Sequence, residues 1–266
     1  MIPANDDPIW EQIRAEVEAD VASEPLLASF LHATILNHSS LAAALSFHLA
    51  NKLQSPTLLA ITLMELMVTA MEDEPEIVEA VRADLAAVRD RDPACSRLST
   101  PLLYFKGFQA LQTYRIANWL WRHDRQPLAT LLQNRVSEVY AVDIHPAATI
   151  GHGILMDHAT GVVIGETARI GNDVSILHGV TLGGTGKEEG DRHPKIGNGV
   201  LLSAGAVILG NVTVGEGAKV AASSVVLKDV PPHCTAVGIP AEIRCKCPNE
   251  SPALVMNHSF DPGPVI

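Results

Sequence analysis

Basic charge, cysteine and long apolar runs are scarce in this 266-residue chain. It carries 19 Lys and Arg against 30 Asp and Glu, which argues against broad phosphate-backbone binding and against a basic membrane-surface helix. No apolar run reaches the roughly 18–20 residues of a membrane span, and the acidic N-terminus is unlike a secretory signal. Four cysteines are too few for a disulfide scaffold, so we expect a reducing, cytoplasmic setting.

Glycine is also nearly missing from the first half of the chain. Of the 19 glycines, only Gly107 lies in residues 1–140. Because glycine is costly inside helices, this half is expected to be all helical, with about six to eight helices. Asp7-Pro8, Ser55-Pro56 and Ser99-Thr100-Pro101 are typical helix starts. We interpret residues 1–140 as a helical oligomerisation domain.

After residue 140, aliphatic residues recur at every sixth position. The pattern runs through Ile144, Ile150, Met156, Val162, then Ile164, Ile170, Ile176, Leu182, and then Ile196, Leu202, Ile208, Val214, Val220, Val226. A period of six fits neither an α-helix nor ordinary hairpins. It indicates a parallel β-helix of hexapeptide units, three of which close a triangular coil of about 18 residues.

One interval breaks the period. The separation of Leu182 and Ile196 is not a multiple of six, and the glycine-rich segment between them predicts a loop extruded over residues 183–194. The segment lacks the full P-loop spacing, because Glu188 follows Lys187. We therefore expect an α+β chain: the helical domain 1–140, a β-helix over 141–245, and a flexible C-terminal tail over 246–266.

Histidines gather in the repeat region: His145, His152, His158, His178 and His193. Equivalent positions on successive coils should be about 18 residues apart, and no pair of these histidines has that spacing, so no metal site is expected. General-base chemistry fits His158 better. Asp143 precedes it by close to one coil length, where a carboxylate would fix the imidazole tautomer. His178 is a second candidate base.

A charged pair ends the extruded loop. The guanidinium of Arg192 beside the imidazole of His193 suits a small carboxylate. Asp157 and Asp92 are candidates for an ammonium group, although Asp92 precedes Pro93 and also fits a turn.

Several segments together resemble one family, the serine O-acetyltransferases of the hexapeptide-repeat acyltransferase superfamily. They are Asp143–Pro146, Asp157–Gly161, Thr181–Lys187, Asp191–Ile196 and Gly238–Ala241, with Glu24–Phe30, Arg91–Ala94 and Thr100–Leu103 in the helical half. The similarity covers about residues 7–245. It implies that the β-helix is left-handed and that the chain transfers the acetyl group of acetyl-CoA to L-serine, giving O-acetyl-L-serine, the first step of cysteine biosynthesis.

The resemblance also implies residue roles. His158 would be the general base and Asp143 would orient it. Bound serine would be held by four side chains: Asp92, Asp157, Arg192 and His193. The first two would meet its amino group and the last two its carboxylate. Acetyl-CoA would run along a groove between neighbouring chains, past Gly184, Thr185, Ala204, Lys219 and Ala222, with Lys219 near phosphate.

Further implications concern partners. The family implies a homohexamer built as a dimer of trimers, inhibition by L-cysteine in the serine pocket, and a complex with O-acetylserine sulfhydrylase through Ile266. Three alternatives remain at this point. They are a CoA-dependent acetyltransferase acting on a sugar or antibiotic hydroxyl, a carbonic-anhydrase-like metalloenzyme, and a purely regulatory partner of the sulfhydrylase.

Overall fold

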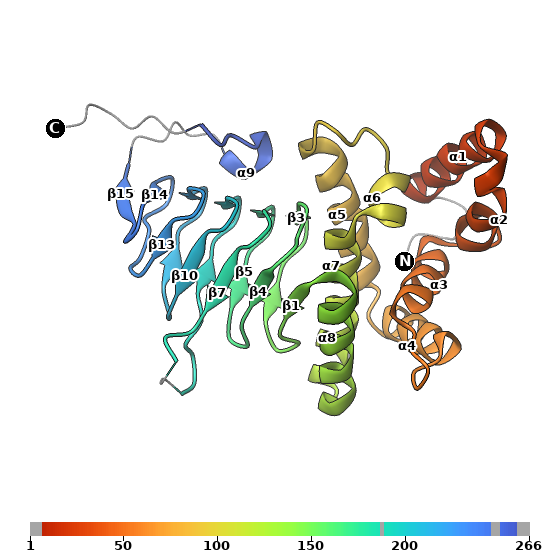
Figure 1. The fold of residues 1–266 in the computed structure, drawn as a ribbon, viewed down its shortest axis with the longest axis horizontal. Helices are drawn as coiled ribbons and strands as arrows, with labels where there is room; N and C mark the ends of the chain where they lie inside the picture. The colour runs from red at the N-terminus through yellow and green to blue at the C-terminus, as the bar shows by residue number, and fades with distance from the viewer. Residues whose placement is uncertain (1–6, 187–188, 246–250, 260–266) are drawn as a thin grey trace. The chain divides into compact units, whose positions relative to one another are not determined.

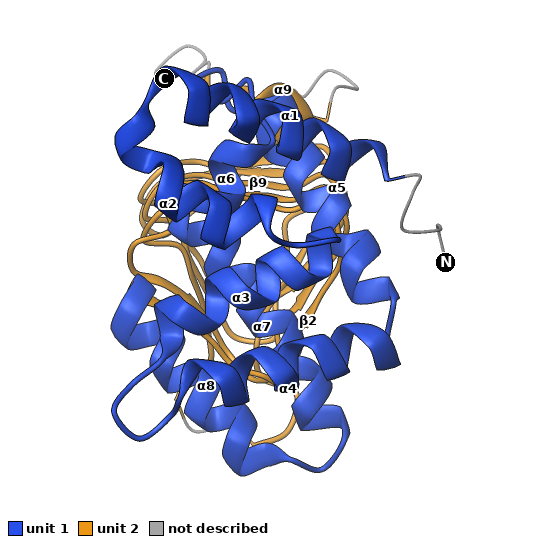
Figure 2. Ribbon diagram, turned by 90° about the vertical axis from the view of Figure 1, so that its right-hand side faces the viewer, with its two compact units in different colours: residues 1–140 blue, residues 141–266 orange. Residues whose placement is uncertain are grey.

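The computed structural model of the chain describes residues 7–186, 189–245 and 251–259. It divides into two compact units, residues 1–140 and residues 141–266 (Figure 2).

The first unit is helical, as expected. Its elements are α1 (Pro8–Ser23), η1 (Pro25–Leu27), α2 (Ala28–Leu31), η2 (His32–Leu36), α3 (Leu41–Leu53), α4 (Ala60–Asp73), α5 (Glu76–Arg91), α6 (Ser99–Tyr104), α7 (Lys106–Arg122) and α8 (Gln126–Tyr140). Asp7 caps α1 by accepting from the Trp10 amide at 3.2 Å, and Pro8 is the first helical residue. The start signal at Ser55 is less exact, because a turn from Ser55 to Leu58 precedes α4.

The helical core contains a few buried polar groups that are paired. Helix α7 is buried along most of its length and meets α5 through an ion pair, in which Arg115 Nη2 lies 2.6 Å from Asp84 Oδ2. Gln112 donates to the same carboxylate oxygen at 3.0 Å. On α3, burial lowers the pKa of His48 to about 4. These groups lie inside the unit, so we assign them to its stability.

The second unit begins as a prism of short strands. They are β1 (Val142–Ile144), β2 (Thr149–Ile150), β3 (Leu155–Met156), β4 (Val162–Ile164), β5 (Arg169–Ile170), β6 (Ser175–Ile176), β7 (Thr181–Gly183), β8 (Lys195–Ile196), β9 (Leu201–Leu202), β10 (Val207–Leu209), β11 (Thr213–Val214), β12 (Lys219–Val220) and β13 (Val225–Val226). Three parallel sheets form its faces. One has the order β1-β4-β7-β10-β13 (Figure 1), and the others contain β2-β5-β8-β11 and β3-β6-β9-β12. This is the predicted parallel β-helix.

The hexapeptide pattern also predicted the core, since every aliphatic residue of the three series is buried except Ile150, which is half-buried. On the face that starts with β1, the residues Ile144, Ile164, Leu182, Ile208 and Val226 are at most 3% exposed. They stack in register on successive coils, so each aliphatic side chain packs on the one above it. A continuous apolar column of this kind is what makes a repeat of such short strands stable.

The coil has the expected length only where the repeat is regular. On one face, Leu202 pairs with Val220, which is three hexads later. The pairings of Met156 with Ile176 and of Ile176 with Leu202 span longer coils. The first excess falls in the turn at residues 157–161 and the second in the extruded loop. The expectation that no two histidines match on successive coils was therefore wrong, because His158 and His178 stand at the same offset from the paired Met156 and Ile176.

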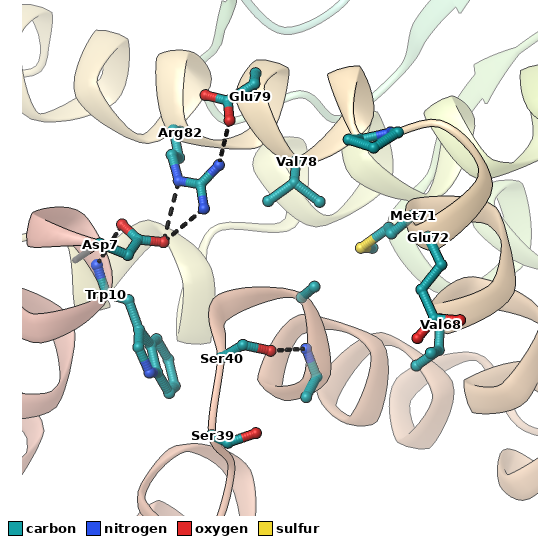
Figure 3. Close-up of a pocket in the computed structure, with 13 residues that line it drawn as sticks. Asp7, Trp10, Ser39, Ser40, Val68, Met71, Glu72, Val78, Glu79 and Arg82 are labelled. Atoms are coloured by element: carbon teal, nitrogen blue, oxygen red, sulfur yellow. Dashed lines mark hydrogen bonds and ion pairs between the residues drawn. The ribbon is translucent and has the colours of Figure 1, made fainter. Parts of the chain in front are cut away.

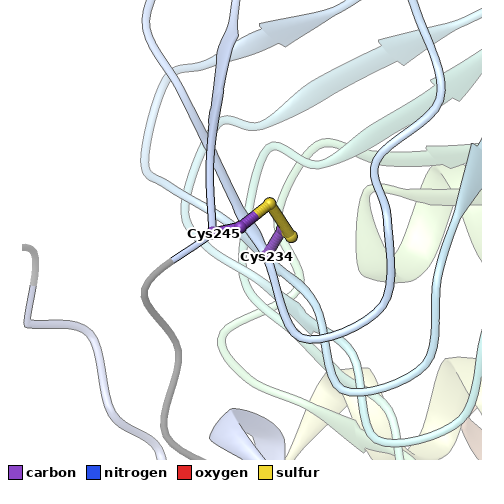
Figure 4. Close-up of a disulfide and its surroundings, with 2 residues drawn as sticks. All are labelled: Cys234 and Cys245. Atoms are coloured by element: carbon purple, nitrogen blue, oxygen red, sulfur yellow. A yellow bond between two sulfur atoms is a disulfide. The ribbon is translucent and has the colours of Figure 1, made fainter.

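A hairpin closes the prism and contains a disulfide. Strands β14 (Thr235–Val237) and β15 (Glu242–Arg244) pair antiparallel, with Thr235 opposite Arg244. This register brings the flanking Cys234 and Cys245 together, with a Cα–Cα distance of 4.3 Å, and the structure joins them (Figure 4). The sequence predicted no disulfide. The two cysteines are 11 residues apart in the sequence, and only the register of the hairpin shows that they face each other.

Part of the expected flexible tail is packed on the β-helix. Residues 251–259 include the short helix α9 (Pro252–Val255). Ser175 Oγ on β6 donates to the Ala253 carbonyl at 3.0 Å, and Ser251 Oγ donates to the Gly199 carbonyl at 3.1 Å. A Cβ on Gly199 would stand 2.5 Å from Ser251 Oγ, so the glycine leaves the space that Ser251 fills.

Candidate active site

His158 lies on a strained turn between β3 and β4. His158 and Ala159 both have left-handed backbones, with φ of 55° and 61°. Each such residue costs about 1–3 kcal/mol when it is not glycine. The turn is held by hydrogen bonds from Gly161 N to Ala141 O and from Gly179 N to Thr160 O, both 2.8 Å. The turn holds the side chain of His158 at the surface, where it is 74% exposed.

Asp157 and His178 both lie close to the imidazole of His158. Asp157 Oδ2 lies 3.6 Å from its Nε2, and the His178 ring lies edge-on with centroids 5.9 Å apart. Both candidate bases thus sit at one corner of the prism. The carboxylate of Asp143 acts on His145, whose pKa is lowered by burial, against smaller opposing effects of Glu166 and Asp143.

The end of the extruded loop lies against the turn that follows β4. Arg192 Nη2 donates to Glu166 Oε2 at 2.6 Å, and Nη1 donates to the Gly190 carbonyl at 3.1 Å. The hydrogen bond from Arg192 lowers the pKa of Glu166, against a smaller cost of burial. The adjacent His193 is 7% exposed.

Three consecutive residues, Gly165, Glu166 and Thr167, seat this loop end. The His193 ring lies directly over Gly165, where an added Cβ would stand 2.1 Å from its Cδ2 and Nε2. Thr167 Oγ1 accepts from the amides of Arg192 and His193 at 3.0 and 3.1 Å. None of these three residues was predicted from the sequence. The only signal in the sequence was the polar pair Glu166 and Thr167 at a corner of the repeat. Its role becomes clear only when the extruded loop of the next coil is seen to pack against it.

Two of the predicted acetyl-CoA contacts, Ala204 and Ala222, lie along the corner of the prism that carries His178. Ala204 and Ala222 follow His178 on successive coils, because Gly205 N donates to His178 O and Ser223 N donates to Ala204 O, both at 2.9 Å. Small side chains at this corner leave the backbone accessible. Gly184 and Thr185 start the extruded loop after β7.

Lys219 is the exception in this set. It is buried in β12, and its Nζ donates to the carbonyls of Asn257 and Ser259 at 3.1 and 2.6 Å. The docked segment 251–259 therefore accepts hydrogen bonds from the ammonium group that, by the resemblance, would lie near the phosphate of acetyl-CoA. A phosphate would reach it only by displacing those carbonyls.

Asp92 belongs to the helical unit, whereas Asp143, Asp157, Arg192 and His193 belong to the β-helix unit. Asp92 follows α5 and its Oδ1 accepts from the Ala94 amide at 2.8 Å, which is the turn geometry that the following proline indicated. Ile266, the predicted contact with the sulfhydrylase, lies outside the described residues.

A separate cavity of about 750 Å³ lies within the helical unit. Helices α1, α3, α4 and α5 line it with Asp7, Trp10, Ser39, Ser40, Ala42, Ala43, Val68, Met71, Glu72, Pro75, Val78, Glu79 and Arg82. Figure 3 shows Arg82 bridging Asp7 and Glu79 at one side, with distances of 2.7 and 2.8 Å. No predicted site residue lines it.

Within the described parts of the chain, no group of three His, Cys, Asp or Glu side chains is placed to hold a metal ion. In the same residues no helix is both long and apolar enough to cross a membrane.

A prism of hexapeptide coils, an extruded loop and an exposed histidine at one corner define a hexapeptide-repeat transferase; the family model for bacterial hexapeptide transferases matches residues 193–228. The model described as serine acetyltransferase, N-terminal, matches residues 9–113. The serine acetyltransferase of Escherichia coli K12 is 55% identical over 262 residues, covering 96% of each chain. The chain therefore belongs to the serine acetyltransferase family, and its β-helix is left-handed.

Three solved structures of the family are similar along most of the chain. Soybean serine acetyltransferase complexed with serine is 62% identical, with a TM-score of 0.87, over 88% of this chain and 97% of that one. The Brucella abortus enzyme in complex with coenzyme A is 51% identical, with a TM-score of 0.90, over 93% and 100%. A serine acetyltransferase in complex with cysteine is 55% identical, with a TM-score of 0.93, over 95% and 98%.

Proposed function

We propose that this chain transfers the acetyl group of acetyl-CoA to the hydroxyl of L-serine, giving O-acetyl-L-serine and CoA, as the first step of cysteine biosynthesis. The observation that carries the proposal is the strained turn that presents His158 beside a corner lined by small residues. The relatives solved with serine and with coenzyme A support both substrates.

His158 is the proposed general base. Its imidazole takes the proton of the serine hydroxyl as the oxygen attacks the thioester carbonyl, and the tetrahedral adduct then expels CoA, whose thiolate receives the proton from the imidazolium. No covalent acyl-enzyme is needed, because holding both substrates together supplies much of the acceleration. Asp143 is the proposed orienting carboxylate, and the Asp157 carboxylate lies 3.6 Å from His158 Nε2.

The proposed serine contacts follow from charge. Arg192 and His193 meet the carboxylate, and Asp157 and Asp92 meet the ammonium group. Arg192 already binds Glu166 through Nη2, which fixes the plane of its guanidinium while other N–H groups remain for substrate. Acetyl-CoA runs along the corner marked by Ala204 and Ala222 and past Gly184 and Thr185, where backbone donors and acceptors suit the amides of its pantetheine arm. Lys219 joins its phosphate only after segment 251–259 moves.

The test is CoA-thiol release from acetyl-CoA, with and without L-serine. Wild-type protein should show serine-dependent release, and His158→Ala should lower kcat by about 10²–10⁴. His178→Ala is the matched control, because its ring lies at the same corner; it should retain most activity. Activity that survives in His158→Ala and falls in His178→Ala would transfer the role of base to His178.

The same assay separates the other candidate functions. Release driven by a sugar or aminoglycoside hydroxyl, and not by serine, would leave the fold assignment but overturn the substrate. Asp143→Asn and Asp157→Asn identify the orienting carboxylate, since the variant that loses kcat with little change in KM for serine lacks it.

Assembly and regulation complete the proposal. We propose a homohexamer, a dimer of trimers, supported by exposed apolar residues such as Leu26 (91%) and Leu227 (56%). Light scattering should give about six times the chain mass.

L-Cysteine should inhibit competitively with serine, and a relative solved in complex with cysteine supports cysteine binding. Deleting Ile266 should abolish binding to O-acetylserine sulfhydrylase and spare turnover. A cytoplasmic location fits these soluble substrates, and cell fractionation tests it.

A further inference from the structure

We propose that Thr167 is a positioning residue that fixes His193 as the neutral tautomer with its proton on Nε2, so that this ring donates a hydrogen bond to the substrate carboxylate. The inference rests on the proposed function for the identity of that carboxylate. The tautomer itself is a property of the protein without substrate.

The backbone of Thr167 determines which nitrogen of His193 lacks a proton. The Thr167 amide donates to His193 Nδ1 at 3.2 Å. An amide N–H can only donate, so Nδ1 must be an acceptor and carries no proton. A neutral imidazole then has its proton on Nε2.

The hydroxyl of the same residue places the ring. Thr167 Oγ1 accepts from the amides of Arg192 and His193 and lies 2.9 Å from His193 Nδ1. Its single proton goes to Nδ1 or to the Asp191 carboxylate, with which this hydroxyl also interacts. Either choice is compatible with an unprotonated Nδ1, because the Thr167 amide already donates to it.

The other nitrogen of the ring is available to a ligand. Among the described residues, His193 Nε2 has no hydrogen-bond partner, and it lies over Gly165 and 3.6 Å from the Cβ position of Gly184, at the start of the extruded loop. A carboxylate there needs a donor. The opposite tautomer would turn a lone pair of Nε2 toward the carboxylate and repel it.

The surrounding charges favour the neutral ring. Burial is the largest effect that lowers the pKa of His193, followed by Arg192, with smaller contributions from Lys195 and His145, against an opposing effect of Glu166. The carboxylate site therefore combines one cation, Arg192, with one neutral donor. Two adjacent cations are avoided, yet a carboxylate still receives hydrogen bonds from both side chains.

Two experiments test the proposal. In the first, ¹⁵N-labelled imidazole signals of substrate-free protein near pH 7.5 are assigned by comparison with His193→Gln. The expected result is an unprotonated Nδ1 and a protonated Nε2. A protonated Nδ1 would overturn the tautomer assignment whether or not the enzyme acetylates serine.

In the second experiment, Thr167→Val keeps the side-chain shape and removes the hydroxyl. It should raise KM for serine at least about tenfold, with a smaller change in kcat and none in KM for acetyl-CoA. Thr167→Ser should restore the serine KM, and Thr149→Val, an exposed threonine on β2, should leave it unchanged. A Thr167→Val enzyme with wild-type KM for serine would refute the positioning role, whereas a wild-type enzyme inactive with serine would refute the proposed function instead.

Discussion

Gly165→Ala is the substitution for which the structure gives the clearest quantitative expectation. The three nearest atoms to an added Cβ all belong to the His193 ring, two of them at 2.1 Å. Carbon contacts settle at about 3.5 Å, so the ring must retreat by roughly 1.4 Å. Gly165 is absent from the residues with positive φ, so alanine fits the backbone and the clash with the ring is the main perturbation.

A shift of that size breaks a hydrogen bond from Nε2 to a bound carboxylate, because donor and acceptor would separate beyond hydrogen-bonding distance. Hydrogen bonds to charged groups contribute about 1.5–3 kcal/mol, which corresponds to about a 10–150-fold loss of kcat/KM for serine. The assay is CoA-thiol release at varied serine and saturating acetyl-CoA. The loss should appear in the serine dependence, while KM for acetyl-CoA stays within about twofold.

The control is Gly171→Ala, at the equivalent position of the next hexad in the same coil. There an added Cβ would meet Asn198 and the backbone of Gly197, away from His193. This variant should lower the melting temperature without raising KM for serine. If Gly165→Ala folds and its kcat/KM for serine remains within about threefold of wild type, the His193 ring does not hold the carboxylate as argued.

Three further predictions concern stability. Burial lowers the pKa of His48 to about 4, so the stability that its neutral ring contributes is complete above pH 6.5 and is lost as the pH falls toward 4. Urea unfolding at pH 7.5 and at pH 4.5 should therefore differ by about 3 kcal/mol in the free energy of unfolding, and His48→Gln should reduce this difference. Asp84→Ala removes the carboxylate that faces buried Arg115 and should lower the free energy of unfolding by about 3–5 kcal/mol, whereas a loss below about 1 kcal/mol would contradict the buried pair. Cys234→Ser should lower the free energy of unfolding by about 3 kcal/mol relative to oxidised wild-type protein. Relative to reduced wild-type protein, the variant should show no measurable loss.

The architecture of the β-helix could be predicted because its sequence signal is local and repeated. Each hexad places one aliphatic residue inward, so Ile164 or Leu182 can be assigned to the core from spacing alone. The helical half was less well predicted. The start signal Ser99-Thr100-Pro101 predicts one helix that continues through Leu102–Trp121. In the structure Phe105 has an extended backbone and divides this segment into α6 and α7.

Contacts that depend on the register between distant strands were beyond the sequence. Cys234 and Cys245 face each other only because β14 and β15 pair with Thr235 opposite Arg244. Lys219 looks like a free cation in the sequence, yet the docked segment 251–259 covers it. In both cases the decisive partner is set by three-dimensional pairing that no local pattern encodes.

The candidate site was visible in the sequence where it interrupts the repeat. A stacked prism tolerates extra residues only at its corners, because an insertion within a strand would move the aliphatic residues out of register. Compared with the regular coil, the chain is slightly longer around His158 and much longer at the loop that ends in Arg192 and His193. Thr167 interrupts nothing, since it occupies a regular corner of the repeat. Its contacts come from the loop folded against it, so deviations from the period identify the candidate binding and reacting residues, and the structure is needed to find those that hold the loop in place.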